Sequence, residues 1–144
     1  MLLKIKLRRA SWEDYPFCYA LARTNMFPYY KKHKLLWESQ AYRKEFDPAF
    51  VRIIEYGNKR IGFCKLIFKE NYGYLSDLQL SASMQGQGIG TMIMKIIEKP
   101  VLNKGYKQIK LRVFPDNPAL KLYLRLGYKK VELDGKFYLM QKKL

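Results

Sequence analysis

The chain has 144 residues, of which 49% are hydrophobic and 28% are charged, with a formal net charge of +16. This length suits a packed core, so we expect one domain over residues 1–144. No apolar run approaches the roughly 20 residues of a membrane helix, which argues against a membrane protein. The high positive charge makes polyanions plausible partners, but the basic pairs are scattered and no RNP-type or zinc motif accompanies them. Nucleic-acid binding is therefore not expected to be the main role.

The two cysteines, Cys18 and Cys64, are far apart and lack the spacing of a redox or zinc motif. Lysines interrupt the apolar residues after Leu3, so the N-terminus does not resemble a signal peptide. These features predict a reduced, cytoplasmic setting in which both cysteines belong to the core.

The first third of the chain predicts a strand followed by helices. Apolar and basic residues alternate over residues 3–8, which is typical of a half-buried strand. Ser11 and Asp14 form a capping-box pattern that predicts a helix from residue 12 to about residue 23. Residues 25–34 surround Pro28 and are rich in aromatic side chains, which predicts a loop or irregular helical connection that could form a substrate wall. A second helix is predicted over residues 35–46.

The rest of the chain alternates strands and helices. Hairpin signals stand at Gly57-Asn58 and at Asp134-Gly135, and the helix after Asn117-Pro118 is predicted to close at Gly127. Pro100 is expected to kink or end the preceding helix near residue 98. The strand-like runs are at residues 50–55, 59–68, 74–80, 107–114, 128–133 and 136–141. Because a helix separates the strand at 107–114 from the one before it, these two are predicted to be parallel.

The stretch Gln85-Gly86-Gln87-Gly88-Ile89-Gly90-Thr91 follows a strand and opens a helix. Glycine permits positive φ angles and lets a ligand approach main-chain N–H groups, and a helix N-terminus attracts anions. A P-loop would need a Lys and a Ser or Thr that are absent here, and a dinucleotide fingerprint would need Gly or Ala in place of Thr91. The remaining alternatives are a phosphate-binding turn and a tight turn with a purely structural role.

Several residues at defined positions together resemble the GNAT superfamily of N-acetyltransferases. They are Gln85-x-x-Gly88-x-Gly90, Leu111-x-Val113, Asn117, Ala119, Tyr123 and Gly127-Tyr128. The resemblance covers the whole chain in element order and is most specific from Asp77 to Tyr128. It implies an α/β fold with a central, mainly antiparallel sheet of about seven strands flanked by about four helices, open between two parallel strands where acetyl-CoA enters.

The resemblance also assigns roles to individual residues. The glycine stretch, residues 85–91, would hold the pyrophosphate of acetyl-CoA, and Asn117 would be a further contact. Tyr123 would protonate the departing thiolate. The strand before the glycine stretch would carry the pantetheine and supply an oxyanion donor, through Leu78, Gln79 and Leu80. Ala119 and Tyr123 each follow Asn117 one residue sooner than in the common family pattern, which would shift the start of the helix.

An acetyl transfer also needs a base, because an amine with a lysine-like pKa is protonated at neutral pH. Asp77, on the strand before the glycine stretch, is the candidate; its structural alternative is a hydrogen-bonded polar residue of a strand. His33 has a suitable intrinsic pKa but stands in a run of lysines that is typical of a solvated basic face. No metal constellation is present, so metal dependence is not expected.

The function implied is transfer of acetyl from acetyl-CoA to a primary amine of a small molecule, protein or peptide by direct attack in a ternary complex. The alternative is a non-catalytic basic module that senses CoA or docks on RNA. The acceptor stays open, and the sequence is compatible with a monomer or a homodimer.

Overall fold

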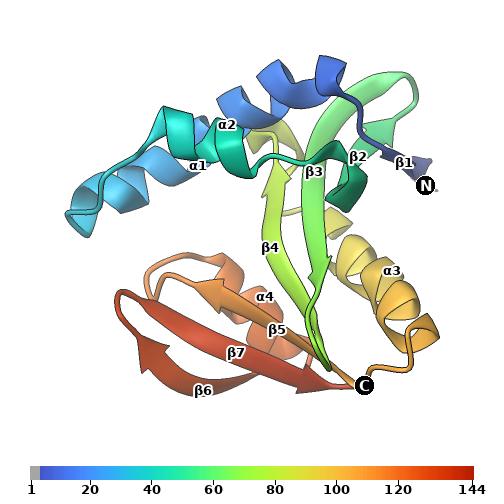
Figure 1. Cartoon of the computed structure of the whole chain (residues 1–144), viewed down its shortest axis with the longest axis vertical. Helices are drawn as coiled ribbons and strands as arrows, with labels where there is room; N and C mark the ends of the chain where they lie inside the picture. Colours follow the sequence, from blue (N-terminus) through green and yellow to red (C-terminus); the bar gives the residue numbers. More distant parts are fainter. Residues whose placement is uncertain (1–3) are drawn as a thin grey trace. The chain divides into compact units, whose positions relative to one another are not determined.

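The structure is a computed structural model that describes residues 4–144. It combines α-helices with one sheet (Figure 1). The strands are β1 (Ile5–Arg9), β2 (Val51–Tyr56), β3 (Lys59–Phe68), β4 (Gly73–Leu80), β5 (Gln108–Val113), β6 (Lys129–Asp134) and β7 (Phe137–Lys143). The α-helices are α1 (Tyr15–Lys32), α2 (Ser39–Glu45), α3 (Ile89–Asn103) and α4 (Ala119–Arg125).

The seven strands are hydrogen-bonded in the order β1-β2-β3-β4-β5-β7-β6. β5 pairs with β4 in parallel and with β7 antiparallel, and the β1–β2, β2–β3 and β6–β7 pairs are also antiparallel. The predicted mixed α/β fold with a mainly antiparallel, seven-stranded sheet and four helices is confirmed. The predicted parallel pair is confirmed as well. Residue 3, at the start of the predicted first strand, lies outside the described residues.

The chain divides into two compact units, which we describe separately. The N-terminal unit comprises the chain up to Lys65 together with Asp77–Met84, and the C-terminal unit comprises Leu66–Ser76 and Gln85–Leu144. β3 and β4 therefore contribute residues to both units. Within residues 4–144, no helix combines the length and the apolar character that a membrane crossing requires.

The core of the N-terminal unit lies between α1 and the sheet residues of β2 and β3. Cys18 and Ala22 of α1 are buried against Val51, Ile53 and Phe63. Aromatic residues of α1 and α2 extend this core, because the ring centroids of Tyr19 and Tyr42 are 5.4 Å apart. Both cysteines are buried and reduced, and burial raises the pKa of each thiol to about 12. A core role fits this environment better than thiolate chemistry.

Helix α1 corrects the prediction for residues 25–34. The chain does not form a loop or irregular connection around Pro28; the helix continues through it to Lys32. A proline inside a helix removes the hydrogen bond to the carbonyl four residues earlier, here that of Thr24. Both Pro28 and Thr24 are exposed, so water can hydrate that carbonyl at little cost.

Helix α2 is shorter than predicted, since residues 35–38 are not helical. Lys34 takes a positive φ of 58°, and the Leu35 N–H donates to the Tyr30 carbonyl at 2.8 Å, which turns the chain away from α1. The second helix begins only after this turn, at Ser39.

Helix α3 packs one side into the C-terminal unit, with Ile89, Ile93, Met94, Ile97 and Val101 buried at helical spacing. The predicted end of the helix near residue 98 is wrong, because the helix continues through Pro100 to Asn103. Pro100 is exposed, and so is Ile96, whose carbonyl loses its partner. The helix ends instead before Gly105, which adopts a φ of 84°.

The turn residues in the sequence correctly predicted the two hairpins and the end of the last helix. The two predicted hairpins join β2 to β3 and β6 to β7, and their glycines, Gly57 and Gly135, have positive φ angles of 62° and 63°. Helix α4 is followed by Gly127 at φ 96°, and the Tyr128 N–H donates to the Tyr123 carbonyl at 3.0 Å. This bond spans the helix C-terminus in the manner of a Schellman motif.

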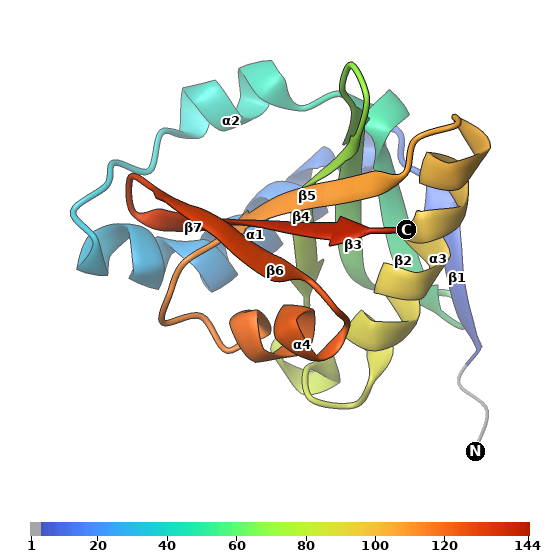
Figure 2. The same ribbon diagram turned by 90° about the horizontal axis from the view of Figure 1, so that it is seen from below.

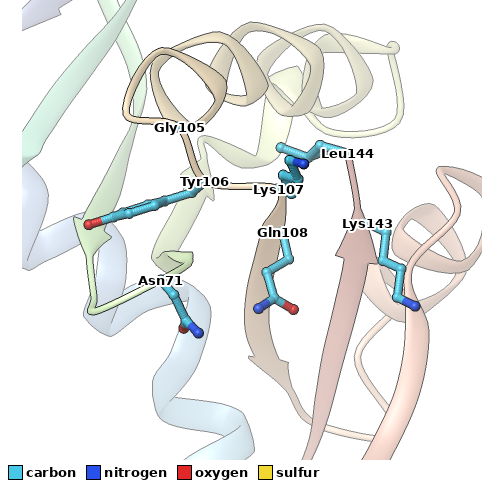
Figure 3. Close-up of a pocket in the computed structure, with 7 residues that line it drawn as sticks. All are labelled: Asn71, Gly105, Tyr106, Lys107, Gln108, Lys143 and Leu144. Atoms are coloured by element: carbon cyan, nitrogen blue, oxygen red, sulfur yellow. The ribbon is translucent and has the colours of Figure 1, made fainter.

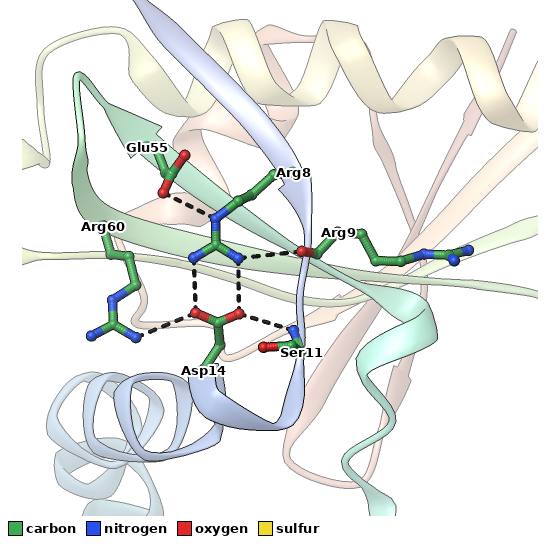
Figure 4. Close-up of polar contacts among 6 residues, drawn as sticks. All are labelled: Arg8, Arg9, Ser11, Asp14, Glu55 and Arg60. Atoms are coloured by element: carbon green, nitrogen blue, oxygen red, sulfur yellow. Dashed lines mark hydrogen bonds and ion pairs between the residues drawn. The ribbon is translucent and has the colours of Figure 1, made fainter.

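A charge cluster joins β1, β2 and the start of α1 within the N-terminal unit (Figure 4). The Arg8 guanidinium donates to both oxygens of Asp14, each at 2.9 Å, and to Glu55 at 3.0 Å. Arg60 reaches Asp14 at 3.3 Å, and the Ser11 N–H completes the predicted capping box at 2.9 Å. The Asp14 side chain is only 4% exposed, and these donors lower its pKa to about 2, chiefly through Arg8.

Candidate functional site

The glycine stretch lies in the C-terminal unit and turns the chain into α3. Gly86 and Gly88 have φ angles of 74° and 83°, which explains the need for glycine at both positions. Gln85, Gly86, Gln87 and Gly88 are exposed, whereas Ile89 is buried and anchors the start of the helix. The turn is therefore fixed at one end and open to solvent at the other.

The first turn of α3 presents main-chain N–H groups toward this turn. The Met92 N–H donates to the Gly88 carbonyl at 3.2 Å as the first turn closes. The N–H groups of Ile89, Gly90 and Thr91 precede it, and in an α-helix such groups point toward the N-terminal end without an intrahelical acceptor. Together with the helix dipole, they form an electropositive end that suits a phosphate.

At Gly90, helix α4 lies close to the N-terminal end of α3. A Cβ added at Gly90 would lie 3.1 Å from Leu122 Cδ2, so glycine permits the close approach of the two helices. Figure 2 shows α4 beside the start of α3. Of the predicted site residues, Tyr123 is the neighbour of Leu122 on α4, so the structure places the two predicted motifs next to each other in one unit.

Tyr123 is 7% exposed, and its ring centroid lies 5.8 Å from that of Tyr128. Tyr128 is 2% exposed, and its hydroxyl has no hydrogen-bond partner among residues 4–144. Burial raises the pKa of the Tyr128 phenol, and the charge of Glu98 raises it further. Two buried tyrosines thus sit side by side, and of these only Tyr123 was assigned a catalytic role from the sequence.

Asn117 caps α4, as its type and position predict. Its Oδ1 atom accepts the Ala119 N–H at 2.9 Å. Since the oxygen is engaged in capping, a contact with a bound ligand would fall to the side-chain amide nitrogen. The role of Asn117 in the helix start is confirmed, while its predicted contact with CoA stays a prediction.

The other predicted residues, Asp77 to Leu80, lie at the end of β4 in the N-terminal unit. Gln79 is 8% exposed, whereas Asp77, Leu78 and Leu80 are half-buried. β4 pairs with β5 in register from Gly73 to Leu75, three residue pairs, before it continues to Leu80. The segment assigned to the pantetheine therefore follows the paired part of the strand.

Asp77 belongs to a hydrogen-bonded chain that the sequence did not reveal. Gln79 Nε2 donates to Asp77 Oδ1 at 3.4 Å, and Gln79 Oε1 accepts from Asn25 Nδ2 at 3.1 Å. Asn25 Nδ2 also donates to the Leu80 carbonyl at 3.0 Å. The contacts of Asn25 were not predicted, because a single asparagine in a segment expected to be irregular does not indicate a hydrogen-bond partner. The continuous helix α1 brings Asn25 to β4.

His33, the other base considered, stands at the C-terminal end of α1, where its main-chain N–H donates to the Tyr29 carbonyl at 2.9 Å. No group of three or more His, Cys, Asp or Glu residues capable of holding a metal occurs in the part of the chain that the structure describes.

A cavity of about 460 Å³ lies in the C-terminal unit (Figure 3). It is near the C-terminal end of α3 and the start of β5, and none of the predicted site residues lines it. Its lining consists of Asn71, Gly105, Tyr106, Lys107, Gln108, Lys143 and Leu144.

Comparison with known proteins supports the family suggested by the sequence. Thialysine N-epsilon-acetyltransferase of Mus musculus is 44% identical over 55 residues, which are 38% of this chain and 32% of the mouse protein. The match thus spans about a third of that relative's length. The match to the family model is longer.

Two solved structures share the fold over nearly the whole chain. PaiA N-acetyltransferase from Thermoplasma acidophilum, in complex with coenzyme A, has a TM-score of 0.80 at 21% identity, covering 99% of this chain and 100% of that one. Naa50 from Arabidopsis thaliana, in complex with the bisubstrate analogue CoA-Ac-MVNAL, has a TM-score of 0.74 at 19% identity, with coverages of 99% and 100%. The model of the Acetyltransferase (GNAT) family matches residues 6–128, and the chain therefore belongs to the GNAT family of acetyltransferases.

Proposed function

We propose that this protein transfers the acetyl group of acetyl-CoA to a primary amine of a small molecule, protein or peptide. The observation that carries the proposal is the glycine turn at the N-terminus of α3, with Gly90 packed against Leu122 of α4. Coenzyme A carries a pyrophosphate, and an open turn at a helix N-terminus suits such an anion. The coenzyme A complex of the fold relative PaiA is consistent with this donor.

In the proposed reaction, the acceptor arrives as an ammonium ion and loses a proton to the Asp77 carboxylate, directly or through water. The free amine attacks the thioester carbonyl carbon, and main-chain N–H groups of residues 78–80 stabilise the charge on the carbonyl oxygen. The C–S bond then breaks as Tyr123 gives its proton to the thiolate. The attacking nitrogen, which still carries one proton more than the neutral amide, returns a proton to the tyrosinate, directly or through water. The net products are the amide, CoA and one proton, with no covalent enzyme intermediate.

The residues proposed to bind acetyl-CoA are considered in each unit by itself. In the C-terminal unit they are Gln85 to Thr91, which face the pyrophosphate, together with Asn117 and Tyr123. In the N-terminal unit, Leu78, Gln79 and Leu80 bind the pantetheine through their main chain. The acceptor class follows the names of the relatives, which include an acetyltransferase for thialysine and one bound to an acetylated peptide analogue.

Two measurements test the proposal. Calorimetry with acetyl-CoA should show binding, and thiol release should then be followed over a panel of small amines, polyamines and peptides. Binding together with CoA release that depends on the amine would support the enzyme. Binding without release for every amine would favour a CoA sensor, and no binding at all would refute the proposed donor.

A further inference from the structure

We propose that Gln79 and Asn25 are positioning residues that orient the Asp77 carboxylate for proton transfer from the acceptor amine. This inference rests on the proposed function, since it concerns the base of that reaction. All three residues lie in the N-terminal unit and form one chain of hydrogen bonds, from Asn25 through Gln79 to Asp77.

The direction of this chain is determined by a main-chain carbonyl. The two ends of an amide side chain look alike, so their assignment depends on their partners. The Leu80 carbonyl is only an acceptor, and therefore the Asn25 group facing it at 3.0 Å must be the NH₂. The same NH₂ faces Gln79 at 3.1 Å, which requires the oxygen of Gln79 there. The NH₂ of Gln79 is then left to face Asp77.

The consequence for Asp77 is a donor that favours its ionised form. Gln79 Nε2 donates to Asp77 Oδ1 at 3.4 Å, a long hydrogen bond that orients this oxygen and stabilises its charge weakly. Gln79 is 8% exposed, so its amide is held by these partners rather than by water.

The charge of Asp77 acts on three titratable groups of the N-terminal unit. The negative charge of Asp77 raises the pKa of Cys18 on α1, Tyr42 on α2 and Cys64 on β3, in each case after the larger effect of burial. All three are neutral near pH 7, so these three groups add no charge beside the carboxylate. The Gln79 amide, which cannot titrate, is therefore suited to orient the carboxylate without changing the charge there.

The test measures kcat/KM as a function of pH and compares the acidic limb of this profile among variants. Gln79→Leu removes the donor, so the limb should move to higher pH by roughly half a unit. Gln79→Glu places a second carboxylate beside Asp77, and sharing of one proton should move the limb further, by roughly one unit or more. Asn25→Ala frees the Gln79 amide to rotate and should shift the limb in the same direction by a smaller amount.

Two controls separate positioning from a general structural effect. Tyr19→Phe removes hydrogen bonds to Ser39 and Trp37 from the same helix, α1, without touching the chain to Asp77, and should leave the limb in place. Asp77→Asn should by itself flatten the acidic limb, and adding Gln79→Leu to it should then leave the profile unchanged. A limb that stays unchanged in Gln79→Leu and in Gln79→Glu would overturn the proposal, as would the same shift in Tyr19→Phe.

A second readout does not depend on catalysis. The carboxyl resonance of Asp77 can be titrated by ¹³C NMR in the unmodified protein and in Gln79→Leu, and its midpoint should rise in the variant. If no amine supports CoA release but the midpoint still rises, the proposed function fails while the hydrogen-bonded chain stands. If CoA release is normal and the midpoint does not move, the positioning role is refuted and the proposed function survives.

Discussion

Leu122 lies so close to Gly90 that a Cβ added to the glycine would be 3.1 Å from Leu122 Cδ2. The contact joins the helix that starts at the glycine stretch to the helix that carries Tyr123. The position of Tyr123 therefore depends on the absence of a side chain at residue 90. This packing contact links the two GNAT motifs, which are separated by more than twenty residues in sequence.

We expect Gly90→Ala to lower kcat because Leu122 must shift and carry its neighbour Tyr123 with it. A displacement of a few tenths of an ångström should cost roughly tenfold in turnover. Leu122→Val, added to Gly90→Ala, removes the colliding methyl group and should restore most of kcat. Leu124→Val is the control, since Leu124 is on the same helix but exposed, and it should not restore kcat. Equal recovery with either valine would contradict the packing account.

Gly88 is tested through its backbone conformation. Gly88→Ala forces an L-residue to adopt a φ of 83°, which should destabilise the protein by about 1–2 kcal/mol and weaken acetyl-CoA binding. Gly57→Ala is the matched control, because Gly57 has a φ of 62° in a hairpin turn and, like Gly88, has space for a Cβ. Calorimetry should show weaker binding only for Gly88→Ala, although both variants unfold at lower temperature. A similar loss of affinity in both would mean that the glycine turn has no special role.

Local turn chemistry explains why much of the fold could be predicted. The hairpin glycines, the Asn117 cap and the glycine stretch each act within a few residues, so their structural effect is visible in sequence. The strand-like run at residues 59–68, next to a hairpin signal, likewise predicted β3 with its observed bounds.

Two of the errors came from prolines, whose cost inside a helix depends on solvent exposure. Pro28 and Pro100 both sit inside helices, because each points to solvent and the carbonyl it deprives can bind water. Burial is a property of the fold and could not be read from the local sequence. The same limit hid Asn25, whose contacts with Gln79 and Leu80 are made 54 and 55 residues away.

Tyr123→Phe should reduce kcat by about 100-fold or more while leaving acetyl-CoA affinity nearly unchanged, because only the proton for the thiolate is lost. Tyr128→Phe is its matched control, with a ring centroid only 5.8 Å away. The Tyr128 hydroxyl is buried without a partner among the described residues, so its removal should stabilise the protein by about 1 kcal/mol and leave kcat unchanged. Assays of CoA release measure the effect on kcat, and urea unfolding measures the effect on stability. An equal loss of turnover in both variants would refute the specific role of Tyr123.

Asp14 should make the stability of the protein depend on acid pH. Its pKa falls from an ordinary value of 3.8 to about 2 in the folded state, chiefly because Arg8 donates to both oxygens. A group whose pKa is lowered by folding stabilises the protein above its unfolded pKa. This stabilisation is lost as the pH falls through the folded value. The contribution should therefore be complete above about pH 4 and disappear toward pH 2.

Asp14→Asn should lower the free energy of unfolding at neutral pH by about 2 kcal/mol, a figure that allows for the exposure of the arginine partners. The deficit relative to the unmodified protein should shrink as the pH falls from about 4 to about 2, because the unmodified Asp14 then becomes neutral as well. Asp134→Asn is the control: the Arg112–Asp134 pair has side chains that are 41% and 47% exposed, and its loss should change the stability by less than about 1 kcal/mol. Urea titrations of the three proteins across this pH range provide the measurement. A deficit for Asp14→Asn that stays constant down to pH 2 would show that the Asp14 charge does not provide the stabilisation.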